Sequence, residues 1–143
     1  MTSKKGFKFL EHVTDVEFES YGKSYPEALE NAAAAMFASQ ARVEKIKPTK
    51  KLAIKETARN LEELALFTLS DLLSQSDAKV LYFKKFKIDS FKKTNTEYSL
   101  SGTAFGAPQK PELYKVVVKA VTLHGEKVEQ KNGAWMLRLL LDI

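Results

Sequence analysis

The chain has 143 residues, of which 44% are hydrophobic and 29% charged, and it contains no cysteine. This size and composition predict one folded domain over residues 1–143 and argue against disorder. Disulfides, thiolate metal sites and cysteine nucleophiles are excluded, and no apolar run approaches the ~20 residues of a membrane span. The short, charged N-terminus does not resemble a signal peptide, so we expect a cytoplasmic protein.

The formal net charge is +5, and almost all of the basic residues are lysines. The arginines are Arg42, Arg59 and Arg138. Lysine supplies point charge, whereas bidentate reading of guanine and phosphate favours arginine. The composition therefore predicts weak attraction to polyanions and no specific reading of DNA.

The first half of the chain alternates extended and helical patterns. Residues 6–21 are predicted to be extended, with a polar interruption at 11–15, because apolar and polar residues alternate after it. Ser24, with Glu27 three residues on, predicts a helix N-cap, and the helix runs to about Ser39. Its predicted buried stripe is Leu29, Ala32, Ala33, Met36 and Phe37.

The second half is predicted to be rich in strands. A short extended piece over 41–46 and a strand over 51–58 precede a second helix, which Asn60 caps and which ends by Ser76, with Phe67 beside its leucines. Strands are then predicted over residues 80–91, 97–105, 114–121, 126–130 and 134–141. Asn132 and Gly133 predict a tight hairpin turn between the last two strands. The pattern predicts an α+β fold in which two helices pack on one face of a mainly antiparallel sheet.

Two polar features are candidates for a site. The segment Glu11-His12-Val13-Thr14-Asp15 lies between apolar strands, and it is either a turn with capping side chains or a site. The last apolar strand is followed at once by Asp142 and Ile143, whose carboxylate and main-chain oxygens are hard donors that suit calcium or magnesium. The alternative is a strand that ends at a solvated edge. Phosphate-binding glycine loops, HExxH and GxSxG are all absent.

A basic stretch between residues 84 and 93 carries five lysines and is interleaved with aromatic residues. Such a stretch can form a nucleic-acid surface. The pattern favours a strand whose aromatic residues face the core and whose lysines face water. His124 is predicted at a turn between two strands, where a histidine is more often structural than catalytic.

Several segments, taken in order, resemble the archease family. The resemblance covers nearly the whole chain and is carried by Phe9-Leu10-Glu11-His12-Val13-Thr14-Asp15, Tyr21-Gly22-Lys23-Ser24 with Glu27-Ala28 and Glu30-Asn31-Ala32-Ala33, Asn60-Leu61-Glu62-Glu63-Leu64, Lys119-Ala120-Val121-Thr122-Leu123-His124-Gly125, and Trp135 with Asp142-Ile143. The departures from the family pattern include Val13 and Glu17 around the aspartate, and Asn60 where an acidic residue is common.

The resemblance implies an SHS2-like α+β module with an insertion. It also implies a non-catalytic accessory protein that promotes guanylylation and turnover of an RtcB-type RNA ligase in tRNA splicing. The accessory protein itself is expected to contact tRNA indirectly or weakly. The family binds a divalent cation, preferably calcium, and its site carries over onto Asp15, Asp142 and Ile143. His12, Asn60 and His124 are candidates for facing a partner.

Two other functions are consistent with the residues. The basic stretch suggests an RNA-binding module or a chaperone for tRNA modification, acting through a basic surface. A stand-alone metal hydrolase would have Asp15 and Asp142, but the sequence shows no recognisable base or nucleophile set for it.

Overall fold

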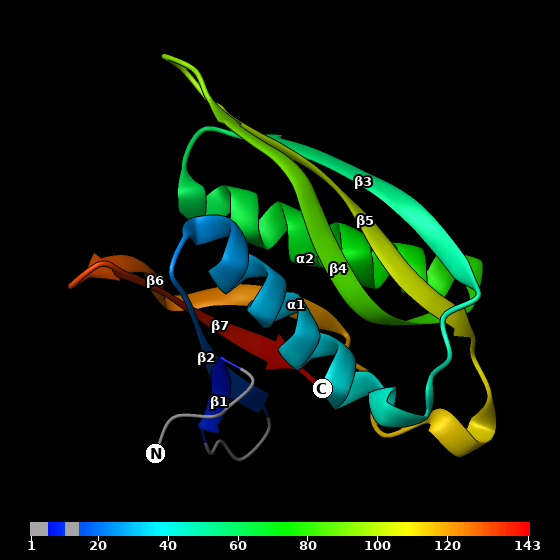
Figure 1. Ribbon diagram of the computed structural model, residues 1–143. Coiled ribbons are helices and arrows are strands. Elements are labelled where there is room, and N and C mark those ends of the chain that lie inside the picture. Colours follow the sequence, from blue (N-terminus) through cyan, green and yellow to red (C-terminus); the bar gives the residue numbers. More distant parts are fainter. Residues whose placement is uncertain (1–5, 11–14) are drawn as a thin grey trace.

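The computed structural model describes residues 6–10 and 15–143, without the side chains of residues 9–10 and 123–127. The strands are β1 (Phe7–Leu10), β2 (Asp15–Gly22), β3 (Lys50–Ala58), β4 (Leu81–Lys93), β5 (Tyr98–Pro108), β6 (Ala120–Lys131) and β7 (Ala134–Asp142). The helices are α1 (Tyr25–Gln40) and α2 (Leu61–Lys79), with short 3-10 turns η1 (Val43–Lys45) and η2 (Pro111–Leu113). Figure 1 shows their arrangement.

The strands form two antiparallel sheets with the two helices between them. One sheet has four strands in the order β1-β2-β7-β6, and the other has three in the order β3-β5-β4. Helix α1 packs against β2 and β7 on one side and β4 on the other, and α2 packs against β3 and β6. The predicted α+β class is confirmed (Figure 1), but the strands are divided between two sheets, so that the helices are covered on both sides.

Both predicted helix N-caps are confirmed. The Ser24 hydroxyl accepts a hydrogen bond from the Glu27 amide at 3.2 Å, and the Glu27 carboxylate accepts one from the Lys23 amide. The Asn60 side chain accepts from the Glu63 amide at 2.8 Å. These bonds satisfy amides that the first helical turn leaves without a partner. Helix α2 runs on to Lys79, past the predicted end at Ser76, and ends where Val80 has a left-handed backbone.

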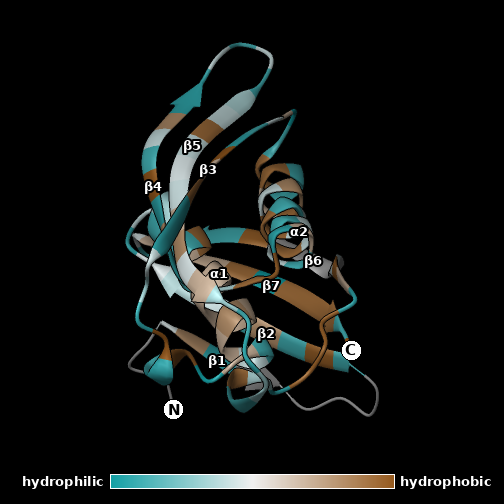
Figure 2. Ribbon diagram, turned by 90° about the vertical axis from the view of Figure 1, so that its right-hand side faces the viewer, coloured by the Kyte–Doolittle hydropathy of each residue, from teal (hydrophilic) through white to brown (hydrophobic). Residues whose placement is uncertain are grey.

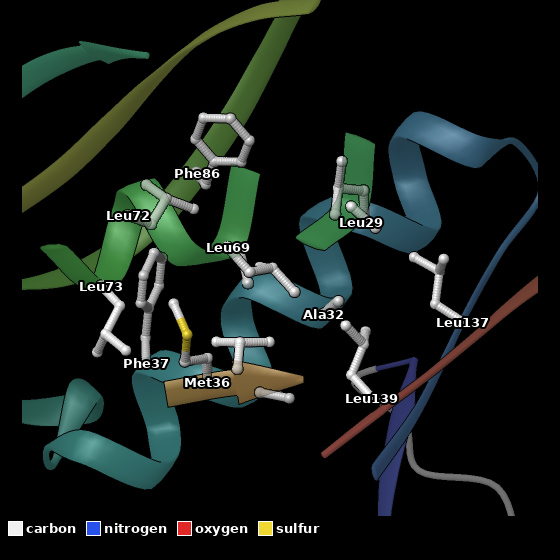
Figure 3. Packing of buried hydrophobic residues seen from close by; sticks show 14 of the residues in the cluster. Leu29, Ala32, Met36, Phe37, Leu69, Leu72, Leu73, Phe86, Leu137 and Leu139 are labelled. Atoms are coloured by element: carbon white, nitrogen blue, oxygen red, sulfur yellow. The ribbon is translucent and has the colours of Figure 1, made fainter. Parts of the chain in front are cut away.

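The core lies between the helices and both sheets. The predicted stripe of α1 is fully buried, and it meets leucines of α2 and β7 (Figure 3). Strand β7 is largely apolar along its length (Figure 2), with Leu137, Leu139 and Leu141 buried. Phe67 is the exception to the predicted pattern, because its side chain on α2 is 40% exposed.

Two predicted extended segments differ from the structure. Within residues 41–46, Val43–Lys45 form the turn η1 and Ala41 forms an isolated bridge with Tyr114. Of the strand predicted over 114–121, residues 115–119 belong to no strand and residues 120–121 begin β6. Strand β6 continues from Ala120 to Lys131 through His124, where a turn was predicted. Its pairing jumps from Thr122 opposite Leu140 to Lys127 opposite Arg138. A bulge of extra residues in β6 therefore replaces the predicted turn.

Candidate metal site

The register of β2 and β7 brings Asp15 and Asp142 together. The two strands are antiparallel, and these two residues are direct cross-strand partners although they are far apart in the chain. Directly opposite residues in such a pair have Cβ atoms about 4.5–5.5 Å apart. The sequence-predicted pair is thus placed side by side at the end of β7.

Both aspartates lie on the outer face of the four-stranded sheet. Their strand neighbours Val16 and Leu141 pack against the core, and side chains alternate between the faces of a strand. Asp15 is partly exposed and Asp142 is exposed. The Asp142 carbonyl accepts a hydrogen bond from the Lys119 amide at 2.7 Å, which ties the end of β7 to the start of β6. The next residue, Ile143, is 37% exposed.

Two carboxylates in direct opposition repel each other unless a cation or a cationic partner lies between them. Their oxygens are the hard donors that calcium and magnesium prefer. Among the residues that the structure describes, no three acidic, histidine or cysteine side chains gather into a metal cluster. Within the described part of the chain, the candidate donors at this edge are the carboxylates of Asp15 and Asp142 and the main-chain oxygens of Ile143.

A different charge arrangement occupies the same face further along the two strands. Glu19 is the cross-strand partner of Arg138 and of Lys8 on β1. The Arg138 Nε donates to Glu19 Oε2 at 3.0 Å, the Tyr21 hydroxyl donates to Glu19 Oε1, and Lys8 Nζ lies 3.7 Å from Glu19 Oε1. Glu19 is only 8% exposed. The sequence pattern did not predict this network, because Glu19 and Arg138 are 119 positions apart in the chain.

The network changes the acidity of its members. Burial alone would raise the pKa of Glu19, but the hydrogen bonds from Tyr21 and Arg138 outweigh burial and hold the pKa below its ordinary value. Burial, together with the bond to Glu19, raises the pKa of Tyr21 to about 12. Glu19 is therefore ionised at neutral pH, and its charge is neutralised within the protein.

A second pair of acidic residues lies between β3 and α2. Burial and then the neighbouring Asp71 raise the pKa of Glu56 to about 8. The Asp71 Oδ1 also accepts a hydrogen bond from Gln75 at 3.4 Å. This pair therefore holds a proton near neutral pH, which relieves its repulsion.

Of the three candidate partner-facing residues, Asn60 is the one whose side chain the structure describes. Asn60 caps α2, on a different element from the aspartates. His124 lies in the irregular part of β6, and its side chain is not among those described. His12 lies outside the described residues.

The described helices include none that is long and apolar enough to cross a membrane.

The fold and the paired aspartates define a small α+β protein with an acidic edge on an open sheet face. The archease protein family model matches residues 7–143. The archease of Methanosarcina mazei is 32% identical over 97% of each chain, and that of Pyrococcus furiosus is 35% identical over 96% of this chain and 98% of its own. The chain belongs to the archease family.

Solved structures agree with this assignment. The solution structure of protein 1598 from Methanobacterium thermoautotrophicum has a TM-score of 0.84 and 28% identity, and the match covers 97% of this chain and 99% of that one. A Thermotoga maritima protein described as an archease and possible chaperone has a TM-score of 0.61 over 95% of this chain and 96% of its own. At 20% identity, that second likeness concerns the fold alone.

Proposed function

We propose that this chain is a metal-binding accessory protein that activates an RtcB-type RNA ligase in tRNA splicing. It promotes guanylylation and turnover of the ligase in the cytoplasm and is not itself a catalyst. The observation that carries the proposal is the direct cross-strand pairing of Asp15 with Asp142 on an open sheet face. Membership of the archease family supports it.

Asp15, Asp142 and the Ile143 oxygens would hold the cation, and calcium fits this donor set better than magnesium. Calcium accepts an irregular shell of oxygen ligands, whereas magnesium demands near-octahedral geometry and gives up water reluctantly. The Asp142 carbonyl accepts a hydrogen bond from the Lys119 amide, which holds the end of β7 in place beside the start of β6. When bound, the cation would supply positive charge to an edge that otherwise presents two like charges.

The partner is expected to meet this edge of the protein. A ligase that binds there would contact the acidic pair and its cation, and the contact would not require the rest of the outer sheet face. The neighbouring charges, Glu19 and Arg138, are already bonded to each other and so contribute less free charge to a contact.

The test is multiple-turnover ligation by an RtcB-type ligase, together with the guanylylated fraction of the ligase, measured with and without this protein. The wild-type protein should raise both. Asp15→Asn and Asp142→Asn should remove most of the stimulation, because each deletes a charged ligand while keeping the shape of the side chain. Glu129→Gln is the matched control, since Glu129 is an exposed acid on the neighbouring strand β6.

Full stimulation by both aspartate variants would show that the acidic edge is not used. No stimulation by the wild-type protein would contradict the activator role. The contribution of Ile143 can be tested separately with a protein that ends at this residue, because a short polar extension then converts the Ile143 carboxylate into an amide. Calcium affinity should then fall in the order wild type, extended protein, Asp142→Ala.

A further inference from the structure

The three-stranded sheet presents an outer face on the side away from the helices (Figure 1). On β5, the buried positions that face the helices are Leu100, Gly102, Ala104 and Gly106. Side chains alternate along a strand, so the residues between them point outward. These outward residues are Ser99, Ser101, Thr103 and Phe105, and each is partly exposed.

Lysines flank this central strand on both sides. Phe105 lies opposite Lys51 of β3 and Lys85 of β4, and Thr103 lies opposite Lys87. Further along, Lys55 is the partner of Ser101 and Lys92 is the partner of Ser99. All five lysines are exposed. We call these five lysines and the four outward residues of β5 the lysine face.

The aromatic residues of the basic stretch itself do not belong to this face. Phe83 and Phe86 are buried at 1% and 2% exposure, which confirms the prediction that they face the core. Phe86 lies against Gly102, where an added Cβ would be 2.8 Å from the phenyl ring. The aromatic residue among the lysines comes instead from the neighbouring strand.

Phe105 is unusual for a residue of its type. Among the described residues, neither of the two buried apolar clusters includes it. It lines an open hollow of about 500 Å³ with Pro48, Lys84 and Lys85. A second hollow of about 330 Å³, lined by Lys55, Lys92 and Ser101 among others, lies at the other end of the face. Asp89 of β4 is an acidic residue beside the lysine face, and the Thr103 hydroxyl donates a hydrogen bond to its carboxylate at 3.2 Å.

We propose that the lysine face binds a single-stranded segment of RNA without strong sequence preference. A base stacks on Phe105, the phosphates lie against the lysines of β3 and β4, and the hydroxyls of Ser99 and Ser101 meet the sugar. Base stacking on an accessible part of an aromatic ring and lysine contacts to phosphate are both tolerant of sequence. This surface is separate from the acidic edge, which lies on the other sheet.

Single-stranded RNA fits this face better than a duplex or DNA. Stacking on Phe105 requires an unpaired base, which a duplex does not offer. The row of hydroxyls on β5 can exchange hydrogen bonds with the ribose 2′-hydroxyl, which DNA lacks. Five lysines around a central strand complement a chain of phosphates.

The lysines alone have another explanation, because β3 and β4 are edge strands and lysine protects exposed edges against pairing with other chains. Edge protection does not require an aromatic residue on the central strand. Phe105 therefore separates the two explanations, and it is the residue to test.

The test is fluorescence polarisation with a labelled RNA of about 12 nucleotides, a length that suits one small binding face, with EDTA and without ligase. Phe105→Ala should weaken binding roughly tenfold, as expected for the loss of one stacked base. Phe67→Ala is the matched control, because Phe67 is the exposed phenylalanine of α2, and it should bind as the wild type does.

The lysines are tested by the salt dependence of binding. The Lys51→Gln and Lys85→Gln double variant should reduce the log–log salt slope by about 1.4, since each phosphate of a single strand contributes about 0.7. Removing the same charge at Lys79 and Lys110, which are exposed elsewhere, should leave the slope unchanged. Asp15→Asn should also bind RNA normally, which separates this proposal from that of the metal edge.

The proposal is overturned if Phe105→Ala binds RNA as tightly as the wild type, because the lysines then act as edge protection or as general positive charge. It is also overturned if duplex RNA or single-stranded DNA of the same sequence binds equally well. Binding to anionic lipid vesicles in place of RNA would overturn it in favour of a membrane surface. Circular dichroism of each variant confirms that a lost affinity is not a lost fold.

Discussion

Two cross-strand pairs of charged residues on β2 and β7 differ in whether their charges are opposite or alike. Glu19 and Arg138 are opposite charges that bond to each other, and Asp15 and Asp142 are like charges in the same kind of opposition. The strands, the register and the sheet face are shared. The first pair is neutralised within the protein, whereas the second consists of two like charges for which we propose a cation. One strand pairing therefore produces both a structural contact and a candidate site.

The pair of Glu56 and Asp71 shows a third solution. There the pKa of Glu56 rises to about 8, so the pair retains a proton near neutral pH. This pair lies between β3 and α2, where burial disfavours charge. At the sheet edge Asp142 is exposed, whereas Asp15, like Glu56 and Asp71, is partly exposed. The candidate metal pair therefore includes one exposed carboxylate, and the proton-holding pair includes none.

The largest expected effect concerns calcium. At a hundredfold excess over its dissociation constant, calcium should stabilise the wild-type protein by about 3 kcal/mol, and magnesium should stabilise it less. Asp142→Asn should lose this gain, yet without metal it should be as stable as the wild type or slightly more stable, because the repulsion is relieved. Urea unfolding with calcium and with EDTA measures both. An equal calcium response in the variant would place the ion elsewhere.

A smaller loss is expected when the complete pair is broken. Arg138→Met should destabilise the protein by about 1–2 kcal/mol. This is less than the loss expected when a fully buried ion pair is broken, because the Arg138 side chain is 38% exposed. The loss arises because Glu19 remains charged and nearly buried. The Glu19→Gln and Arg138→Met double variant should recover part of it. If the two single losses simply add in urea unfolding, the two residues are not energetically coupled.

The smallest effect is a pH dependence of the same pair. The pKa of Glu19 is below its ordinary value of 4.5 in the folded protein, so its stabilising contribution is present above that value. It is lost as the pH falls below 4.5 through the folded pKa. The stability difference between the wild type and Glu19→Gln should therefore be constant near neutral pH and shrink in acid. A difference that grew on acidification would reverse the assigned direction.

Much of the local structure followed from the sequence. Ser24 and Asn60 have the spacing of N-caps, and Asn132 and Gly133 both adopt the positive φ of the predicted hairpin turn. These signals depend on residues within one turn of each other, where the physics is local. The failures have a cause that is not local. The valine-rich residues 115–119 were predicted to belong to a strand over 114–121, but in this fold they lie outside the strands, and Tyr114 before them forms an isolated bridge with Ala41.

The sequence by itself determined both helices with their N-caps, most of the strands, the buried face of α1, and that Asp15 and Asp142 carry oxygen donors. The family resemblance added the expectation that the two belong to one site. Only the tertiary structure decided that the strands divide into two sheets, that Asp15 stands opposite Asp142, that Arg138 is the partner of Glu19, and that Phe105 stands among lysines of two other strands. Alternation reveals which face of a strand a residue occupies, but the neighbouring strand and its register depend on contacts between segments distant in the chain.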